Sequence, residues 1–418
     1  MSAEPAEKRH VTVIGAGIVG ISCAVHLLRG GHAVRVVDRL PPGEGCSKGN
    51  AGMFSSDSFV PLGLPGDLWN VPGWLLDPLG PLAIRWRHAP RLLPWLSGFL
   101  KAGRPERVAE ICDALAPLLA SSPEHHKRLA KGTAAEGLIR RQGAIYVYEN
   151  AKSLAKDELA WTYRRERGSV PQPLTAAEIR ELEPALAPIY EHGYLMPDLG
   201  HTTEPMRLVK ALAEHFQQSG GEIARREVRD IDIGPDGPRR LLTDAGELDL
   251  DVLVIAAGAW SGRLAAKLGY RVPIEGERGY HITVANPGIG IGMPVFVATY
   301  KFIATPMDPG LRFAGTAEFA GLESEPNPGR WRVLVRHAKR MFPEIDTSEI
   351  SEWAGLRPTL PDSLPVIGPA PGIDNVIFAF GHQHVGLTAG PRTGEIIADL
   401  VGGRAPNIDL RPFRVDRF

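Results

Sequence analysis

The chain contains 418 residues, which is long enough for two connected domains with a large core. Its 47 basic residues nearly balance 48 acidic ones and no long basic run is present, so the composition argues against nucleic acid and indicates small-molecule partners. The three cysteines lack the spacing of a metal site and predict a reducing compartment. Because the first residues are polar and charged, we expect no signal peptide and a cytoplasmic protein.

The first predicted element is a dinucleotide-binding β-α-β unit that starts at a short apolar strand, Val11 to Ile14. The pattern G-x-G-x-x-G follows, in which the first glycine permits the tight turn and the second lets backbone N–H groups approach a pyrophosphate. The third glycine lets the helix lie close to the strand, and the N-terminus of the helix faces the phosphates. The residues expected to bind a dinucleotide here are Gly15, Ala16, Gly17, Ile18 and Gly20.

A second predicted strand, from Ala33 to Val37, ends at Asp38, where a carboxylate can accept hydrogen bonds from the adenosine ribose. Arg39 follows directly and is included in the expected cofactor site. The uncharged stretch from Val11 to Leu28 is also long enough to suggest a membrane span. Its three glycines and His26 fit a lipid-exposed helix poorly, so we expect a buried strand and helix instead.

The next segment is a long loop, Leu40 to Gly66, that is rich in small residues. Loops of this length inside compact folds tend to be functional or disordered, and the sequence CSKGNAG suits contact with a flat ligand. Helical patterns then dominate from about Pro90 to Lys156, interrupted by a predicted strand at Ala144 to Tyr148. The loop residues expected to contact the cofactor are Ser47, Asn50, Ala51 and Gly52.

The segment 68–100 concentrates four of the eight tryptophans, with Arg85, Arg87 and Arg91 among them. Tryptophan and arginine beside apolar residues suit a membrane interface. The segment therefore predicts peripheral contact with the inner face of the cytoplasmic membrane, with a buried lid or a dimer contact as the alternatives that stay open.

In the middle of the chain, the sequence predicts a helix from Glu204 to Ser219 and then a strand that contains Val228. The run Leu248 to Ser261 predicts an apolar strand followed by a turn of small residues. This pattern is expected where the backbone approaches the cofactor a second time. From Val272 to Phe319 the residues alternate as in β-strands. This part of the chain adds four residues to the expected cofactor site: Val228, Ala257, Gly258 and Trp260.

The last segment, Trp353 to Gly403, returns to a strand, a glycine turn and a helix predicted from Pro391 to Leu400. Strand-to-glycine turns thus recur near residues 15, 258 and 381, and three approaches to one cofactor favour FAD over NAD. The helix is expected to aim its N-terminus at the flavin and to stabilise the negative charge of the reduced ring. The cofactor residues expected here are Gly381, Gly386, Leu387 and Thr388.

The predicted fold class is α/β, with a Rossmann-like, discontinuous FAD-binding domain and an inserted α+β substrate domain that contains a mainly antiparallel sheet. The FAD-binding domain is predicted at 9–66, 195–270 and 353–418. The substrate-binding domain is predicted at 67–194 and 271–352.

Five blocks of sequence, in one order, resemble the D-amino acid dehydrogenases, flavoproteins of the wider D-amino acid oxidase and glycine oxidase group. The blocks are VIGAGIVGISCAVHL from Val13, GCSKGNAGM from Gly45, RGYH from Arg278, WAGLRPTLPDSLPVIG from Trp353 and GHQHVGLTAGP from Gly381. The resemblance implies non-covalent FAD and oxidative deamination of a D-amino acid to a 2-oxo acid and ammonia. It also implies electron delivery to a quinone or other carrier rather than mainly to oxygen.

Hydride transfer from Cα to flavin N5 requires a substrate that is held at near-attack distance, and therefore an anchor for its carboxylate. Arg357 has the planar fork for a bidentate clamp, and the resemblance implies this role; the alternative is a structural ion pair. Tyr280 is expected to add a hydroxyl to the same carboxylate unless it is an ordinary strand tyrosine. His384 is expected near the ring or the substrate, or else within a hydrogen-bond network. No metal is expected.

Two other functions stay open within this interpretation. A cis-4-hydroxy-D-proline dehydrogenase, or another enzyme that oxidises secondary amines, would share the flavin motifs and differ only in pocket shape. A flavin-retaining regulatory protein without turnover is disfavoured because Arg357 and the turn GHQHVG are both present.

Overall fold

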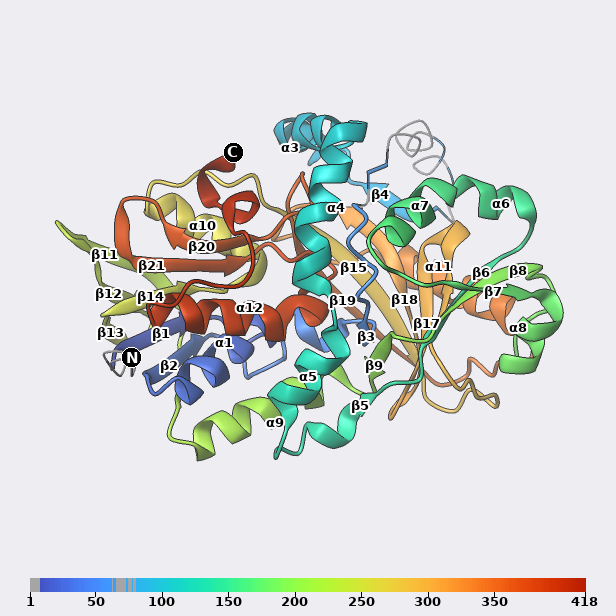
Figure 1. Ribbon diagram of the computed structural model, residues 1–418, viewed down its shortest axis with the longest axis horizontal. Helices are drawn as coiled ribbons and strands as arrows, with labels where there is room; N and C mark the ends of the chain where they lie inside the picture. Colours follow the sequence, from blue (N-terminus) through green and yellow to red (C-terminus); the bar gives the residue numbers. More distant parts are fainter. Residues whose placement is uncertain (1–7, 62, 65–72, 74–76, 78–79) are drawn as a thin grey trace.

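The computed structural model describes residues 8–61, 63–64, 73, 77 and 80–418. Two lobes lie side by side along the long axis, and helix α4 (Pro105–Leu119) runs between them (Figure 1). One lobe contains a mainly parallel sheet built from the two ends and the middle of the chain, and the other a large, mainly antiparallel sheet. The mixed α/β fold that the sequence predicts is therefore confirmed.

The parallel sheet has the strand order β10-β2-β1-β14-β21-β20, in which only β20 runs antiparallel to its neighbour. Apolar and often β-branched residues fill its central strands, as expected for strands covered on both faces. The strands are β10 (Glu222–Arg225), β2 (Ala33–Asp38), β1 (His10–Ile14), β14 (Val252–Ile255), β21 (Ile373–Phe380) and β20 (Val366–Ala370).

Helices α1 (Ile18–Arg29) and α12 (Gly386–Val401) pack against one another on the same face of this sheet (Figure 1). A Cβ added at Gly394 would lie 2.6 Å from the carbonyl oxygen of Ser22, so the close contact of the two helices requires a glycine there. The predicted start of the last helix at Pro391 is wrong. The helix begins at Gly386, and a side chain of α5 (Ser122–Ala130) supplies the donor that Pro391 lacks.

The antiparallel sheet has the order β19-β15-β18-β17-β16-β6-β8-β7, with β4 paired to β18. Only the pairs β16·β6 and β18·β4 are parallel. Its strands are β19 (Ile350–Thr359), β15 (Glu275–Val284), β18 (Gly310–Phe319), β17 (Phe302–Met307), β16 (Val295–Val297), β6 (Ala144–Tyr148), β8 (His192–Met196), β7 (Gln172–Thr175) and β4 (Leu82–Ile84).

The predicted domain boundary at residue 353 falls inside β19, so the strand that carries Arg357 belongs to the antiparallel sheet. The rest of the domain division stays a prediction. One face of the sheet is covered by α11 (Pro328–Met341), whose Leu334 joins Phe313 of β18 in a buried cluster.

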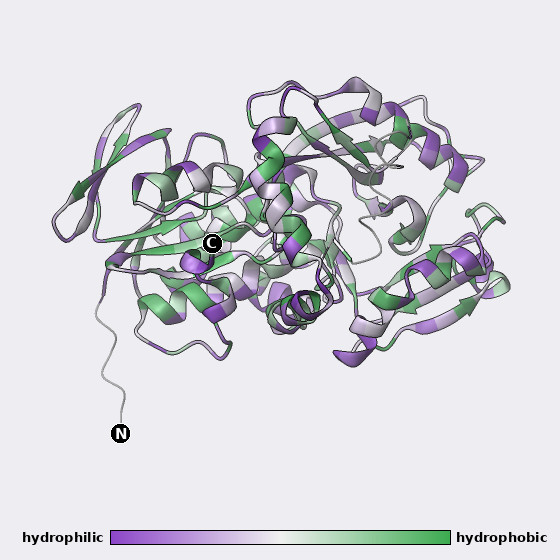
Figure 2. Ribbon diagram, turned by 90° about the horizontal axis from the view of Figure 1, so that it is seen from above, coloured by the Kyte–Doolittle hydropathy of each residue, from purple (hydrophilic) through white to green (hydrophobic). Residues whose placement is uncertain are grey.

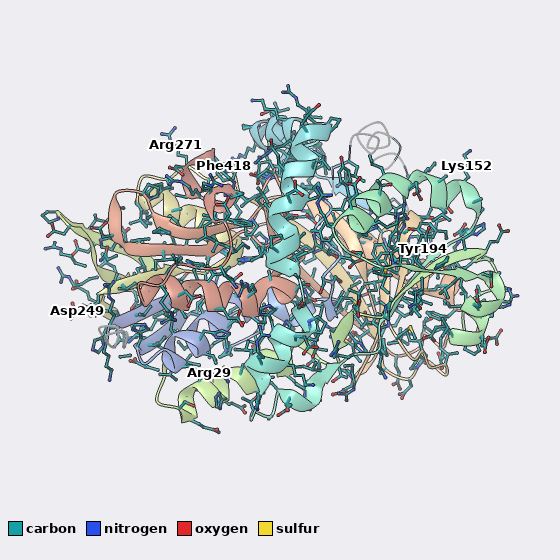
Figure 3. All side chains as sticks on the ribbon, viewed as in Figure 1. Arg29, Lys152, Tyr194, Asp249, Arg271 and Phe418 are labelled. Carbon is teal, nitrogen blue, oxygen red and sulfur yellow. The ribbon has the colours of Figure 1, made fainter. Side chains whose placement is uncertain are left out.

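Two small sheets and several helices complete the described part of the molecule. Apolar residues concentrate in the strands and on the inner sides of the helices, whereas charged side chains such as Lys152 and Arg271 lie at the periphery (Figures 2 and 3). The small sheets are β11 (Val228–Gly234), β12 (Gly237–Thr243) and β13 (Gly246–Asp249), and β3 (Met53–Phe54), β9 (Gly200–Thr202) and β5 (Ile139–Arg140). The helices are α3 (Ala89–Ala102), α6 (Ala151–Lys156), α7 (Glu158–Glu166), α8 (Ala176–Leu182), α9 (Pro205–Gln218) and α10 (Ser261–Lys267).

Candidate active site

A cavity of about 690 Å³ lies at the carboxyl ends of four neighbouring parallel strands, β2, β1, β14 and β21. Ligands of open α/β sheets bind at this edge, and the volume is in the range of small-molecule sites. Each strand contributes the residues where it ends, for example Asp38, Gly15, Ala257 and Gly381. We call this the dinucleotide cavity.

The glycine turn after β1 is closely packed on one side and open to the cavity on the other. Gly15 has φ +115°, and a Cβ there would lie 2.3 Å from the carbonyl oxygen of Ala256. A Cβ at Gly20 would lie 1.8 Å from the carbonyl oxygen of Gly15, so this glycine serves helix-strand packing. At Gly17 the nearest atom to an added Cβ is Ser47 Oγ at 3.3 Å. The Gly17 backbone therefore stays accessible on the cavity side.

The carboxylate of Asp38 holds two backbone segments at the mouth of this cavity. Its Oδ2 accepts a hydrogen bond of 2.7 Å from the Ala16 N–H, and its Oδ1 accepts one of 2.9 Å from the Leu40 N–H. Next to it, the Arg39 guanidinium lies 4.4 Å from the centre of the Trp260 ring. The contact of Arg39 with Trp260 joins the segments that follow β2 and β14, which lie more than two hundred residues apart in the sequence.

Most of the predicted cofactor residues come together around this cavity. Ala51 and Thr388 instead line a second cavity beside it. Gly20 and Gly52 line neither cavity, and a Cβ at Gly52 would lie 2.7 Å from Met307 Cε. The predicted residues that line the dinucleotide cavity are Gly15, Ala16, Gly17, Ile18, Asp38, Arg39, Ser47, Asn50, Val228, Ala257, Gly258, Trp260, Gly381, Gly386 and Leu387.

The second cavity, of about 410 Å³, adjoins the first, and Cys46, Asn50, Trp353, Gly355 and Gln383 line both. We call it the substrate cavity. One of its walls is apolar and comes from α3 and β18, and its polar groups include side chains from β15, β19, α7 and the loop before α12. The apolar wall consists of Leu92, Trp95, Leu96, Phe99 and Phe319.

Arg357 and Glu277 face this cavity from adjacent strands, where they are direct cross-strand partners. Arg357 Nη1 donates a hydrogen bond of 2.5 Å to Glu277 Oε1. The Arg357 side chain is 23% exposed and that of Glu277 only 5%. Gly279 leaves room for the guanidinium, because a Cβ there would lie 2.4 Å from Arg357 Nη2. The arginine is thus paired on one side and accessible on the other.

A β-bulge lies directly beside this ion pair. The register of β15 and β18 shifts between Gly279 and Tyr280, and the extra residue of β18 is Thr316, with φ +55°. A β-branched residue with this φ is strained and persists only where its surroundings enforce it. The bulge turns the Thr316 carbonyl oxygen toward Arg357 Nη1, at 3.4 Å.

The other two predicted catalytic residues also line the substrate cavity. The Tyr280 hydroxyl donates to Glu318 and accepts a hydrogen bond of 2.9 Å from the Asn327 N–H, and burial raises its pKa to about 12. The hydroxyl therefore already donates its hydrogen bond within the protein, to Glu318. Its predicted contact with a substrate carboxylate stays a prediction. His384 is exposed to the cavity, yet the surrounding protein desolvates the imidazole and lowers its pKa to about 4, so it is neutral at pH 7.

Residues of the antiparallel sheet hold the loop that separates the two cavities. Arg312 Nη1 donates to the carbonyl oxygens of Asn50 and Lys48, at 2.8 and 3.3 Å. His281 Nδ1 lies 3.1 Å from the Gly49 carbonyl oxygen. Burial raises the pKa of the Cys46 thiol in this loop to about 11, which keeps it protonated and unreactive.

Sequence reasoning missed Glu277, Arg278 and Arg312. Arg278 is buried, lines the dinucleotide cavity and donates to the Ser324 carbonyl oxygen. The motif RGYH, with Glu277 before it, was the available signal, because charged residues inside an apolar strand need partners. The residues present fit FAD: the open Gly17 backbone gives room for a pyrophosphate, and three separated segments of the chain line one cavity.

Comparison with known proteins also indicates a flavoprotein that binds FAD. The family model described as FAD dependent oxidoreductase (DAO) matches residues 10–400. A D-amino-acid oxidase of Bradyrhizobium diazoefficiens is 40% identical over 99% of both chains. A D-amino acid dehydrogenase of the same organism is 32% identical over 98% of both.

Solved structures share the fold at lower identity. Glycine oxidase from Geobacillus kaustophilus superposes with a TM-score of 0.76 at 23% identity, covering 98% of this chain and 100% of that one. L-proline dehydrogenase from P. horikoshii gives a TM-score of 0.76 at 19% identity, covering 99% and 98%.

Proposed function

Because the chain belongs to the DAO family of FAD-dependent oxidoreductases, we propose that it oxidises D-amino acids to 2-oxo acids and ammonia. The preference for D-amino acids is supported by relatives of 40% and 32% identity that are named for this substrate class and match nearly the whole chain. The observation that carries the proposal is the position of Arg357, an accessible guanidinium in a cavity that adjoins the dinucleotide cavity and shares lining residues with it.

FAD, when bound, supplies the acceptor of the hydride that leaves Cα. The protein contributes the geometry. Arg357 offers a planar fork that can bind the substrate carboxylate through two parallel hydrogen bonds. Glu277 and the Thr316 carbonyl fix the position of Nη1. We expect a substrate held in this way to direct its Cα toward the dinucleotide cavity, because orientation of the reacting atoms contributes strongly to the rate.

The start of α12 supports the proposed transfer of hydride to FAD. Because the helix begins at Gly386, both Gly386 and Leu387 belong to its first turn and line the dinucleotide cavity. The positive end of a helix stabilises nearby negative charge. We therefore expect this turn to stabilise the anionic reduced cofactor and to raise its electron affinity.

For the electron acceptor, we propose a quinone or another lipophilic carrier reached at a membrane surface. The segment 78–105 contains five Arg and Lys residues and no Asp or Glu. Within it Trp86, Leu93 and Leu100 are 77%, 63% and 54% exposed, and the two leucines lie seven residues apart on one face of α3. An exposed apolar face with basic neighbours complements an anionic lipid surface.

The described parts of the chain contain no helix that is long and apolar enough to cross a bilayer. The contact proposed is therefore peripheral. Part of the segment predicted to touch the membrane, including Trp69 and Trp74, lies outside the described residues. Trp95 is buried instead and donates to the Thr359 carbonyl oxygen, so the inner side of α3 closes the substrate cavity.

The proposal is tested by incubating the purified holoprotein with single D- and L-amino acids, and with cis-4-hydroxy-D-proline, in the presence of an artificial quinone. We expect quinone reduction, one ammonia and one 2-oxo acid per turnover with several D-amino acids, and little hydrogen peroxide without the quinone. Turnover with the cyclic substrate alone would replace the proposal by a secondary-amine dehydrogenase. No product from any of them would refute it.

A further inference from the structure

We propose that Glu277 binds the ammonium group of the substrate, so that Arg357 and Glu277 together recognise the zwitterion. The inference rests on the proposed function and assigns a role to a residue that motif reasoning does not reach. It follows from the position of the carboxylate, the hydrogen-bonding capacity left on it, and the charge balance of the cavity.

The position is set by the sheet. Glu277 on β15 stands directly opposite Arg357 on β19, and both line the substrate cavity. Among the described residues, one other carboxylate lines this cavity, that of Asp157. Asp157 belongs to a separate group, in which its Oδ2 accepts a hydrogen bond of 2.6 Å from the Tyr148 hydroxyl and lies 4.0 Å from Arg164. Glu277 is therefore the carboxylate beside the expected anchor of the substrate.

The Glu277 carboxylate retains acceptor capacity. Its Oε1 accepts from Arg357 Nη1, and its Oε2 accepts a hydrogen bond of 3.1 Å from Thr359 Oγ1. An ionised carboxylate offers about four lone-pair sites. Two donors leave room for an ammonium, whose charge would strengthen the bond.

The charge balance gives the selectivity. Among the described residues, the charged side chains that line this cavity are Arg357, Glu277, Asp157, Arg164 and Lys301. Arg357 and Glu277 form a neutral pair among them, and Glu277 is only 5% exposed. A simple carboxylate that binds to Arg357 places a second negative charge beside Glu277 without adding a positive one, which is costly where solvation is poor. A zwitterionic amino acid adds one charge of each sign, so that each charge has a partner. The pair should therefore reject carboxylates and 2-hydroxy acids that lack an amino group.

The same contact answers a chemical requirement. An ammonium nitrogen has no lone pair with which to form the C=N bond. One of its protons must therefore leave before Cα can lose its hydrogen as hydride. A Glu277 oxygen in contact with the nitrogen can take that proton.

A different role for Glu277 would be to hold Arg357 in place and nothing more. The two roles differ in what they predict for a ligand without an amino group. If Glu277 only positions Arg357, its loss should weaken the binding of amino acids and of plain carboxylates to the same degree. If Glu277 binds the ammonium group, it should strengthen the binding of amino acids and weaken the binding of plain carboxylates.

The test uses the holoprotein and a matched pair of ligands, 2-aminoisobutyrate and isobutyrate. The amino acid has no Cα hydrogen and cannot be oxidised, so dissociation constants are measured at equilibrium from the flavin absorbance. The wild type should bind the amino acid at least tenfold more tightly than isobutyrate. In E277Q, binding of 2-aminoisobutyrate should weaken about tenfold or more, as expected for a lost charged hydrogen bond. Binding of isobutyrate should stay equal or tighten.

Two further variants complete the design. E277D keeps the charge and should keep the preference for the amino acid, and E110Q, the control at an exposed carboxylate that lines neither cavity, should leave it unchanged. Equal weakening of both ligands in E277Q, or equal affinity of the wild type for both, would overturn the proposal. Failure of the protein to oxidise any D-amino acid would instead refute the proposed function, because this binding test needs no turnover.

Discussion

His126 Nε2 lies 2.7 Å from the backbone carbonyl oxygen of Leu387, in the first turn of α12. In a regular helix this carbonyl would accept the N–H of residue 391, but residue 391 is proline and has none. Because a carbonyl can only accept, His126 must carry its proton on Nε2. Its ring also stacks on Phe54, with centroids 4.0 Å apart. A side chain from α5 thus completes the helix that lines the dinucleotide cavity.

Replacing His126 by phenylalanine should destabilise the protein by about 1–3 kcal/mol, because a buried carbonyl loses its donor while the ring stacking is kept. Urea denaturation measures the free energy of unfolding. In the background H126F, the change P391A restores an N–H at residue 391 and should recover part of the loss. Additive destabilisation by the two changes would contradict the proposed pairing.

Stability should fall as the pH drops below about 6.5. Burial lowers the pKa of His126, His281 and His382 to about 3, from an ordinary value of 6.5. Since the folded pKa lies below the unfolded one, the unfolded chain takes up these protons first, and stability is lost progressively between pH 6.5 and 3. Each histidine contributes a slope of about 1.4 kcal/mol per pH unit. Between pH 6 and 5 the free energy of unfolding should fall by about 1.4 kcal/mol less in H126F than in the wild type, and an equal fall in the two proteins would disprove the contribution of His126.

Glycine at position 17 should be needed for FAD binding but not for folding. Gly17 has φ −74°, which any residue adopts, and an added Cβ meets only Ser47 Oγ at 3.3 Å within the protein. The variant G17A should therefore fold with nearly wild-type stability as the apoprotein and bind FAD at least tenfold more weakly, since its methyl group faces the cavity. G137A, where a Cβ meets nothing within 4 Å, is the control. Full flavin occupancy of G17A would show that Gly17 does not approach the cofactor.

The exposed face of α3 should determine binding to anionic vesicles. The double variant L93S/L100S should reduce co-sedimentation with vesicles that contain phosphatidylserine, because it removes apolar area that would enter the interface. L159S/L182S alters two exposed leucines on other helices and should leave binding unchanged. Equal binding of all three proteins would refute the proposed membrane contact.

Local elements were predictable from the sequence, whereas contacts between distant segments were not. The unit from Val11 to Asp38 follows from its own residues, since strand, glycines and helix are neighbours in the chain. The pair of Arg357 and Glu277 joins residues 80 positions apart, and its geometry depends on strand register and on the bulge at Thr316. No local pattern encodes these. The start of α12 was misplaced for a related reason, because proline is typical of a helix start and its compensating donor comes from another helix.

The central claim is that Arg357 anchors a D-amino acid against FAD, and anaerobic stopped-flow mixing with the enantiomers of alanine tests it most directly. We expect D-alanine to bleach the flavin absorbance band and L-alanine to leave it unchanged. In R357K the charge opposite Glu277 is kept but the bidentate fork is lost, so the half-saturating concentration of D-alanine should rise at least tenfold. Equal bleaching by both enantiomers, or a wild-type response in R357K, would contradict the account.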